Sequence, residues 1–296
     1  MIKNLILGAV AMAVIAWLFS ACSCATKRSD GSGSRPLIAV SIPPQLFFIK
    51  AIAGDRVDTF CLLESSADPE SFEPSMNQLV ALEKAAVYLP MGELAFEKSL
   101  IDKLKANNSS LEIEKVTEGI VPLEGTHSHH DGHHSHDVDP HMWSSAVNGK
   151  IIALNTLDAL IKADSKNEDI YRANYGRLEH RIDSIDSCFR EVFSRPDVTK
   201  SFIVWHPSLS YFARDYGLTQ LALSMSGKES SVKGMIDRMD AIKSSGAEVY
   251  FYQKEFDNDR AKSIARETDT NVVEINPMNE EWEDEMQKLY DAFTVN

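Results

Sequence analysis

A dense group of histidines lies near the middle of the chain. Six of the nine histidines fall in the stretch Gly125-Thr-His-Ser-His-His-Asp-Gly-His-His-Ser-His136. Imidazole is the commonest protein ligand for zinc and related metals, and a histidine-rich tract is typical of metal binding. The alternatives are a neutral solvated loop and a purification tag, although a tag is usually terminal and uninterrupted. We expect secondary metal capture by His127, His129, His130, His133, His134 and His136.

Further polar residues follow predicted strands, often beside a proline. They are found in Ala67-Asp-Pro-Glu-Ser-Phe-Glu-Pro-Ser75, Asp139-Pro-His-Met-Trp143, His206-Pro207, Gln253-Lys-Glu255-Phe256 and Asn276-Pro277. In open parallel sheets, ligands bind beyond the carboxyl ends of the strands. These loops are therefore the places where ligating side chains can converge.

The elements that must position these loops alternate between short apolar runs and helical periodicity. We expect strands at 37–42, 57–63, 87–89, 111–116, 201–205, 221–223, 249–252 and 272–275. We expect helices at 44–54, 75–86, 96–106, 145–161, 168–193, 207–216, 231–245, 258–268 and from 280 onward. The pattern predicts an α/β protein with two mostly parallel sheets, joined by a long rigid helix.

The N-terminus predicts export. Lys3 precedes the apolar run Leu5 to Phe19, which is shorter than the roughly 20 residues that a spanning helix needs. The small residue before Cys22 is similar to a bacterial lipobox, so we expect Cys22 to carry a lipid anchor. The expected division is a signal peptide at 1–21, a flexible tether at 22–36, a first lobe at 37–146, a helical segment at 147–196 and a second lobe at 197–296.

Charge and cysteine usage narrow the function classes. The net charge of −14 argues against nucleic acid as a partner. If Cys22 carries lipid, Cys24, Cys61 and Cys188 remain, an odd number without a CxxC pair, so no disulfide framework is implied. We expect Cys61 and Cys188 to be buried free thiols rather than metal ligands.

These motifs, taken in order, resemble the cluster A-I metal-binding lipoproteins, the solute-binding components of bacterial zinc and manganese ABC importers. The likeness covers nearly all of the mature chain. It depends on the loop 67–75, the histidine-rich insert followed by Asp139-Pro-His-Met-Trp-Ser144, Trp205-His206 with Tyr211-Phe212, Tyr216-Gly217-Leu218 and Val249-Tyr-Phe251. The resemblance implies two α/β lobes joined by one long helix, with the metal buried between them.

The resemblance also implies a ligand set. His141 and His206 fall on family histidines, while Glu70 stands where the first family histidine is usual and Asn276 where Asp is common. Two histidines plus one glutamate form an established zinc set. We therefore expect Glu70, His141 and His206 as ligands, with Glu255, Asn276 or water in the fourth position. Glu73 is expected to orient a ligand.

Two function classes follow from such a site. The first is a lipid-anchored, monomeric protein facing the periplasm or cell exterior that binds Zn²⁺ and delivers it to an ABC permease. Manganese is the alternative metal, but His206 favours zinc because Mn²⁺ prefers oxygen ligands. The second class is a secreted zinc hydrolase, although the sequence contains no HExxH motif. We therefore expect a binding protein rather than an enzyme.

Overall fold

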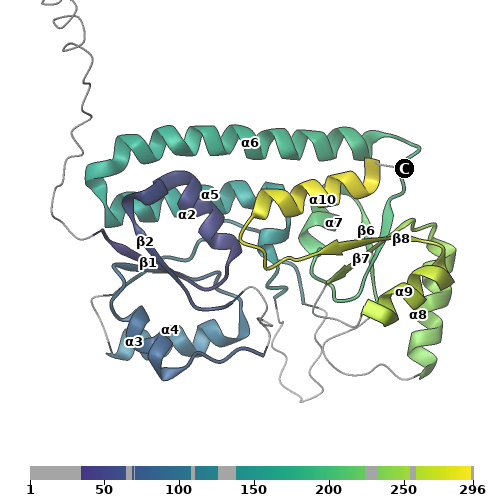
Figure 1. Ribbon diagram of the computed structural model, residues 1–296, viewed down its shortest axis with the longest axis horizontal. Helices are drawn as coiled ribbons and strands as arrows, with labels where there is room; N and C mark the ends of the chain where they lie inside the picture. The colour runs from purple at the N-terminus through teal and green to yellow at the C-terminus, as the bar shows by residue number, and fades with distance from the viewer. Residues whose placement is uncertain are drawn as a thin grey trace, which may run out of the picture. The chain divides into compact units, whose positions relative to one another are not determined.

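The computed structural model describes residues 35–64, 69, 71–107, 111–125, 138–223, 232–253 and 258–294. Two four-stranded sheets lie within these residues, and all their paired strands are parallel (Figure 1). The first sheet has the order β2-β1-β3-β4, from β1 (Leu37–Val40), β2 (Asp58–Cys61), β3 (Val87–Leu89) and β4 (Glu112–Ile113). The second has the order β6-β5-β7-β8, from β5 (Ser201–Val204), β6 (Thr219–Ala222), β7 (Val249–Gln253) and β8 (Asn271–Ile275). The predicted α/β class with parallel sheets is confirmed.

Local sequence explains how the first sheet's helices begin and end. Helix α2 (Pro44–Ala53) has proline in its first turn and stops at Gly54, whose φ of 55° suits glycine. A short 3-10 turn, η1 (Gly54–Arg56), leads into β2. Ser75 and Gln78 form a capping box at the start of α3 (Met76–Leu82). Helix α4 (Ala95–Asn107) completes this region.

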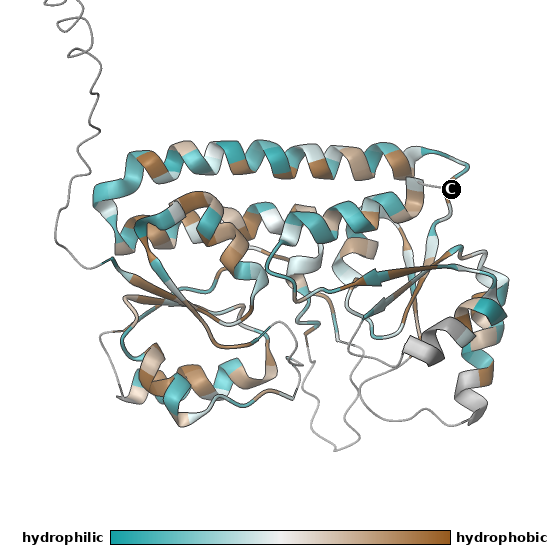
Figure 2. Ribbon diagram, viewed as in Figure 1, coloured by the Kyte–Doolittle hydropathy of each residue, from teal (hydrophilic) through white to brown (hydrophobic). Residues whose placement is uncertain are grey.

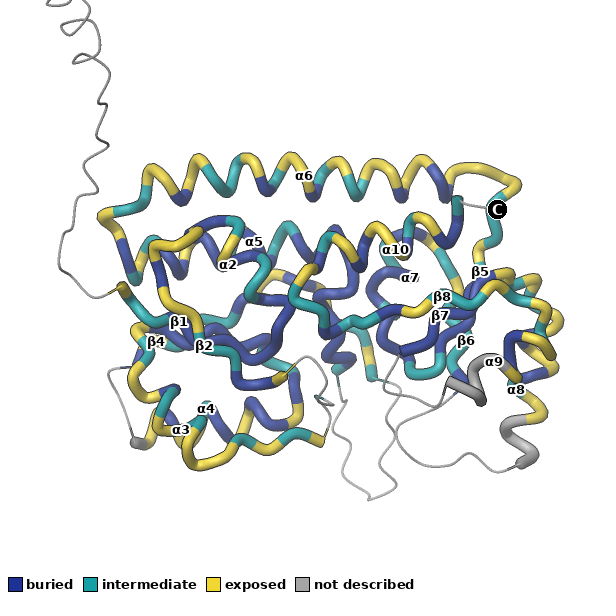
Figure 3. The backbone as a smooth tube through the Cα atoms, viewed as in Figure 1, coloured by how far each residue is buried: buried dark blue, intermediate teal, exposed yellow. Residues whose placement is uncertain are grey.

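The predicted long helix is α6 (Glu168–Ser194), which follows α5 (Ala146–Ala163) and the turn η3 (Ser165–Asn167). Its buried residues recur at helical spacing along one face, and the opposite face is exposed (Figure 3). It contacts α2 and α5 as well as α7 (Ser210–Tyr216) and α10 (Trp282–Thr294). Because α6 contacts elements associated with both sheets, it acts as the expected rigid strut.

The second sheet carries α7, α8 (Val232–Ser245), α9 (Asn258–Thr268) and α10. The predicted helix start at 207 is wrong, since α7 begins at Ser210. The preceding residues form a turn in which Ser208 N–H donates to His206 O at 2.8 Å. The side chain of Gln220 accepts a hydrogen bond from Leu209 N–H at 2.8 Å.

One apolar core connects the two sheets. It includes β1, β3, β5 and β7 residues together with the inner faces of α2, α5, α6 and α10. Figure 2 shows the matching pattern, in which strands are mainly hydrophobic and α6 is largely hydrophilic on its outer side. A second cluster contains residues of β5, β7, α8 and α9. Residues 35–296 accordingly form one compact unit.

Candidate metal centre

His206 lies just beyond the carboxyl end of β5, which is an interior strand of the second sheet. Strand β5 pairs with β6 on one side and with β7 on the other. The order of strands therefore reverses between β5 and β7, because the chain adds β6 to one side of β5 and then β7 and β8 to the other. Such a switch point is where open α/β sheets bind ligands. His206 is partly buried, and its Nε2 atom is shielded from solvent. The fold therefore presents this imidazole where a bound ion is expected.

His141 belongs to the segment that leads from the first sheet into α5. It precedes the 3-10 turn η2 (Met142–Ser144), and only 4% of its surface is exposed. The Asp139 carboxylate accepts the His141 backbone N–H at 2.9 Å and lies 2.9 Å from Nδ1 of the ring. A carboxylate in this position favours the tautomer that carries its proton on Nδ1, which leaves Nε2 able to bind a metal.

The two imidazole rings lie close enough to each other to share an ion. Their ring centres are 5.1 Å apart, with an angle of 66° between the ring planes. For zinc–nitrogen bonds of about 2.0–2.1 Å at a tetrahedral angle, two ring centres should be about 5 Å apart. The observed separation of His141 and His206 fits this value.

Asp139 supplies negative charge beside this pair. Its burial would raise the carboxyl pKa, but hydrogen bonds from His141 and Ser210, with the charge interaction at His141, lower the pKa below its ordinary value. The carboxylate therefore stays ionised at neutral pH. An ionised partner on Nδ1 makes His141 a better donor to a dication.

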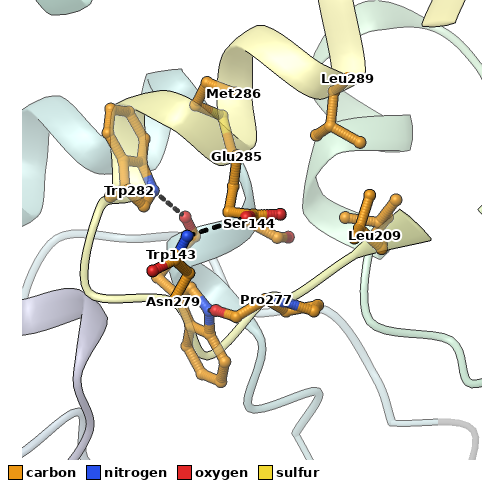
Figure 4. A pocket seen from close by; sticks show the side chains of 10 residues that line it. Trp143, Ser144, Leu209, Pro277, Asn279, Trp282, Glu285, Met286 and Leu289 are labelled. Atoms are coloured by element: carbon orange, nitrogen blue, oxygen red, sulfur yellow. Dashed lines mark hydrogen bonds between the residues drawn. The ribbon is translucent and has the colours of Figure 1, made fainter. Parts of the chain in front are cut away.

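Two tryptophans attach the His141 segment to the second region. Trp143 packs against the His141 ring with centres 5.3 Å apart, and its Nε1–H donates to Pro277 O at 2.7 Å. Trp282 Nε1–H donates to Trp143 O at 2.7 Å. Figure 4 shows both indoles beside a pocket that Leu209, Met286 and Leu289 also line. The turn after His141 is thus hydrogen-bonded to the first residue of α10 and to the loop that precedes this helix.

Asn276, an open choice for the fourth ligand, is engaged elsewhere. Its Oδ1 accepts the Met278 N–H at 3.0 Å, and its own N–H donates to the buried Glu285 carboxylate at 2.8 Å. The amide oxygen therefore stabilises a turn. Glu73, expected to orient a ligand, is exposed.

Several predicted site residues lie outside the described part of the chain. They are Cys22, Glu70, Glu255 and the insert histidines His127, His129, His130, His133, His134 and His136. The signal peptide and the lipidated part of the tether lie outside it as well. Within the described residues, no group of three or more His, Cys, Asp and Glu side chains is arranged to hold a metal. The structure thus brings together His141 and His206, with Asp139 behind the first.

The described cysteines are free thiols. Burial raises the pKa of Cys61 to about 12, with an opposing effect from its hydrogen bond to Leu63 O. Because metals bind the thiolate, Cys61 is poorly suited to be a ligand. The expectation that Cys188 is buried is wrong: it lies on the exposed side of α6.

Sequence patterns alone did not assign roles to Asp139 and Tyr211. The Tyr211 hydroxyl donates to Asp139 O at 2.8 Å, a contact 72 residues apart in the sequence. Asp139 carried a usable signal, because a carboxylate two residues before a ligand histidine can reach its ring. The role of Tyr211 had no such signal in the sequence, because its partners are brought to it only by the fold.

Comparison with known proteins shows the family of the chain. Residues 38–295 match the protein family described as zinc-uptake complex component A, periplasmic. The chain belongs to this family. A crystal structure of a ZnuA deletion mutant with zinc bound is 30% identical, with a TM-score of 0.76, covering 89% of this chain and 100% of that one.

Curated relatives of this family member include longer proteins. The zinc-binding protein AdcA of Streptococcus pyogenes serotype M1 is 25% identical over 87% of this chain and 53% of its own length. The zinc-binding lipoprotein AdcA of Streptococcus pneumoniae strain R6 is 23% identical over 85% of this chain and 51% of its own length. The chain therefore spans about half the length of these relatives. Within its described residues, no helix is long and apolar enough to cross a membrane.

Proposed function

We propose that this protein captures Zn²⁺ outside the cytoplasm and delivers it to the membrane permease of an ABC importer. The observation that carries the proposal is the His141–His206 pair, whose ring centres lie 5.1 Å apart with Asp139 bonded to the first ring. Family membership and the zinc-binding names of the relatives support the same cargo. The residues would hold the ion as cargo rather than as a resident cofactor.

The proposed ligand set is His141, His206 and Glu70. A glutamate oxygen binds zinc at about 2.0–2.2 Å and adds negative charge near the dication. For the fourth position we propose Glu255 or water, since the Asn276 oxygen is bonded to Met278 N–H.

His206→Ala tests this assignment. Loss of an outer partner of a ligand already weakens metal binding about 10- to 100-fold, so loss of a ligand should weaken zinc binding more than about 100-fold. Calorimetry with chelator competition would measure the tight site. His180→Ala is the matched control, because His180 is exposed on α6 and should leave that site unchanged. An intact tight site in His206→Ala would refute the proposed ligands.

Zinc is preferred over manganese because two imidazoles converge. Nitrogen ligands suit zinc, whereas Mn²⁺ favours carboxylate, carbonyl and water oxygens. In a competition titration Zn²⁺ should displace Mn²⁺ from the site, and the reverse order would support the alternative cargo. A secreted zinc hydrolase is the other class, and enzyme-like turnover of peptides or esters by the zinc-loaded protein would favour it.

We also propose that the protein is a monomeric lipoprotein with Cys22 as its acylated residue, divided into the segments 1–21, 22–36, 37–146, 147–196 and 197–296. The lipoprotein name of the pneumococcal relative supports the anchor. The insert histidines would gather zinc near the envelope. Cys22→Ser should release the protein from the membrane fraction, and retention of the variant there would exclude this anchor.

A further inference from the structure

The two ends of the histidine-rich insert meet at its base. The chain leaves at Glu124 and returns at Val138, and these two residues form an antiparallel bridge. The neighbouring pair on the side away from the insert is also bonded, because Asp139 N–H donates to Leu123 O at 2.9 Å. The two ends of the insert are therefore held together at a base formed by residues 123–124 and 138–139, and Asp139 in this base is two residues before His141.

The hydroxyl of Tyr211 binds both sides of this base. It accepts the Leu123 N–H at 3.1 Å and donates to Asp139 O at 2.8 Å. Tyr211 is fully buried, and burial is the largest cause of its raised pKa of about 12, so it keeps its proton at physiological pH. A single buried hydroxyl thus acts as acceptor for one arm and donor for the other.

Tyr211 also connects the two histidines. It stands in the first turn of α7, five residues after His206, while the Asp139 that it holds is bonded to the ring of His141. Arg214, one turn later, stacks over the Tyr211 ring at 4.9 Å and donates to Val121 O at 2.7 Å. The segments that carry the two imidazoles are therefore joined directly through α7.

We propose that Tyr211 is a positioning residue of the metal site: its hydroxyl fixes the Asp139–His141 segment against the His206 segment and closes the base of the insert. It touches no metal itself and acts through Asp139. In this arrangement the spacing of the two imidazoles is established before zinc arrives. The part of the proposal that concerns zinc affinity rests on the proposed function, whereas the part that concerns His141 orientation does not.

Tyr211→Phe is the direct test, because it keeps the ring and its stacking with Arg214 but leaves Leu123 N–H and Asp139 O without the hydroxyl. We expect the Kd of the tight zinc site in the full chain to rise about tenfold, within the range seen when outer partners of ligands are lost. Tyr216→Phe is the matched control. Its buried hydroxyl, also on α7, donates to Asp186 at 3.0 Å on α6, so its removal should lower stability while changing the Kd less than about twofold.

A second measurement separates positioning from general stability. In the metal-free protein, the ring ¹⁵N shifts of His141 should indicate one dominant tautomer, which Tyr211→Phe shifts toward a mixture and Tyr216→Phe does not. The proposal is overturned if Tyr211→Phe leaves either the zinc Kd or these ring shifts unchanged, or if Tyr216→Phe alters them equally. If the unmodified protein binds no zinc tightly, the proposed function fails, and the metal-free ring shifts alone then decide the role of Tyr211.

Discussion

Asp139 and His141 form one hydrogen-bonded unit at the proposed metal site. The carboxylate contacts both the backbone N–H and the Nδ1 atom of His141, so it fixes the ring orientation and the position of the proton. Only a few per cent of either residue is exposed. Water cannot easily replace a buried hydrogen-bond partner, so loss of this carboxylate should weaken metal binding by Nε2 of His141.

We expect Asp139→Asn to weaken zinc binding by about 10- to 100-fold, since the amide lacks the charge that stabilises the metal-bound ring. Chelator competition would measure the change. The control is Asp164→Asn, which alters a similarly buried carboxylate bonded to Tyr171 and Asn167 at the end of α5. That control should reduce stability but leave zinc affinity unaltered, and equal losses in both variants would argue against a role specific to Asp139.

Another buried carboxylate, that of Glu97, holds the loop between β3 and α4. It accepts hydrogen bonds from the Ser41 hydroxyl and the N–H groups of Met91, Gly92 and Leu94. Burial is the largest influence and raises the Glu97 pKa, while these four hydrogen bonds oppose it. The carboxyl is therefore a titrating group inside the first sheet's core.

Glu97 should make stability depend on pH. Its folded pKa lies above the ordinary 4.5, so its contribution is fully present below that value and is lost as pH rises through the folded pKa. Glutamine does not titrate. The stability advantage of the native protein over Glu97→Gln in urea unfolding should therefore shrink as pH rises, and an advantage that grows would contradict the assignment.

At the scale of residues, the sequence predicted the two candidate ligand histidines but not the residues that position them. His141 and His206 stood in recognisable motifs, and the structure brings their rings together. The contribution of Tyr211 depends on contacts 72 and 88 residues away in the sequence, which local patterns do not encode. Glu70 and Glu255 lie outside the described residues and stay predictions.

Among the elements, those with strong periodicity were the easiest to predict. Helix α6 was expected at 168–193 and runs from Glu168 to Ser194, because its buried side chains repeat with the helical period. Boundaries at the site were less predictable. Residues 207–209 were expected to be the start of a helix, but α7 begins at Ser210, and the Gln220 side chain from β6 accepts a hydrogen bond from Leu209 N–H.

Close packing of α5 against α10 provides a prediction about Gly149. A Cβ built there would lie 2.9 Å from the Trp282 ring, whereas one at Gly176 on α6 would meet nothing within 4 Å. Gly149→Ala should therefore destabilise the protein by about 1–3 kcal/mol in urea unfolding, because Trp282 must move. Gly176→Ala should be neutral or stabilising by up to about 1 kcal/mol, as alanine favours helix. Equal effects of the two substitutions would show that the contact with Trp282 is unimportant.

For the molecule as a whole, the two sheet regions share one core and several direct bonds. Hydrogen bonds join the His141 segment to the second region. Trp143 Nε1–H donates to Pro277 O, Trp282 Nε1–H donates to Trp143 O, and the Tyr211 hydroxyl donates to Asp139 O. Such a structure suits a binding site that is largely formed before its cargo arrives. The sequence predicted two regions and a strut, but the shared core depends on long-range packing that it could not specify.

The insert is a separable feature at this scale, since its two ends meet at the Glu124–Val138 bridge. Deletion of Thr126 to His136 should therefore remove weaker zinc equivalents and leave the tight site within about threefold of its original affinity. Calorimetry resolves the two classes of site. Loss of the tight site on deletion would indicate that the insert supplies a ligand to it. Unchanged uptake under severe zinc limitation would exclude a gathering role for the insert.

The most direct test is anomalous diffraction at the zinc edge from crystals of the zinc-loaded protein. We predict one strong peak about 2.0–2.1 Å from a ring nitrogen of both His141 and His206, with Glu70 oxygen as a further ligand. A strong peak bound only by the insert histidines, with neither His141 nor His206 within bonding distance of zinc, would contradict the account.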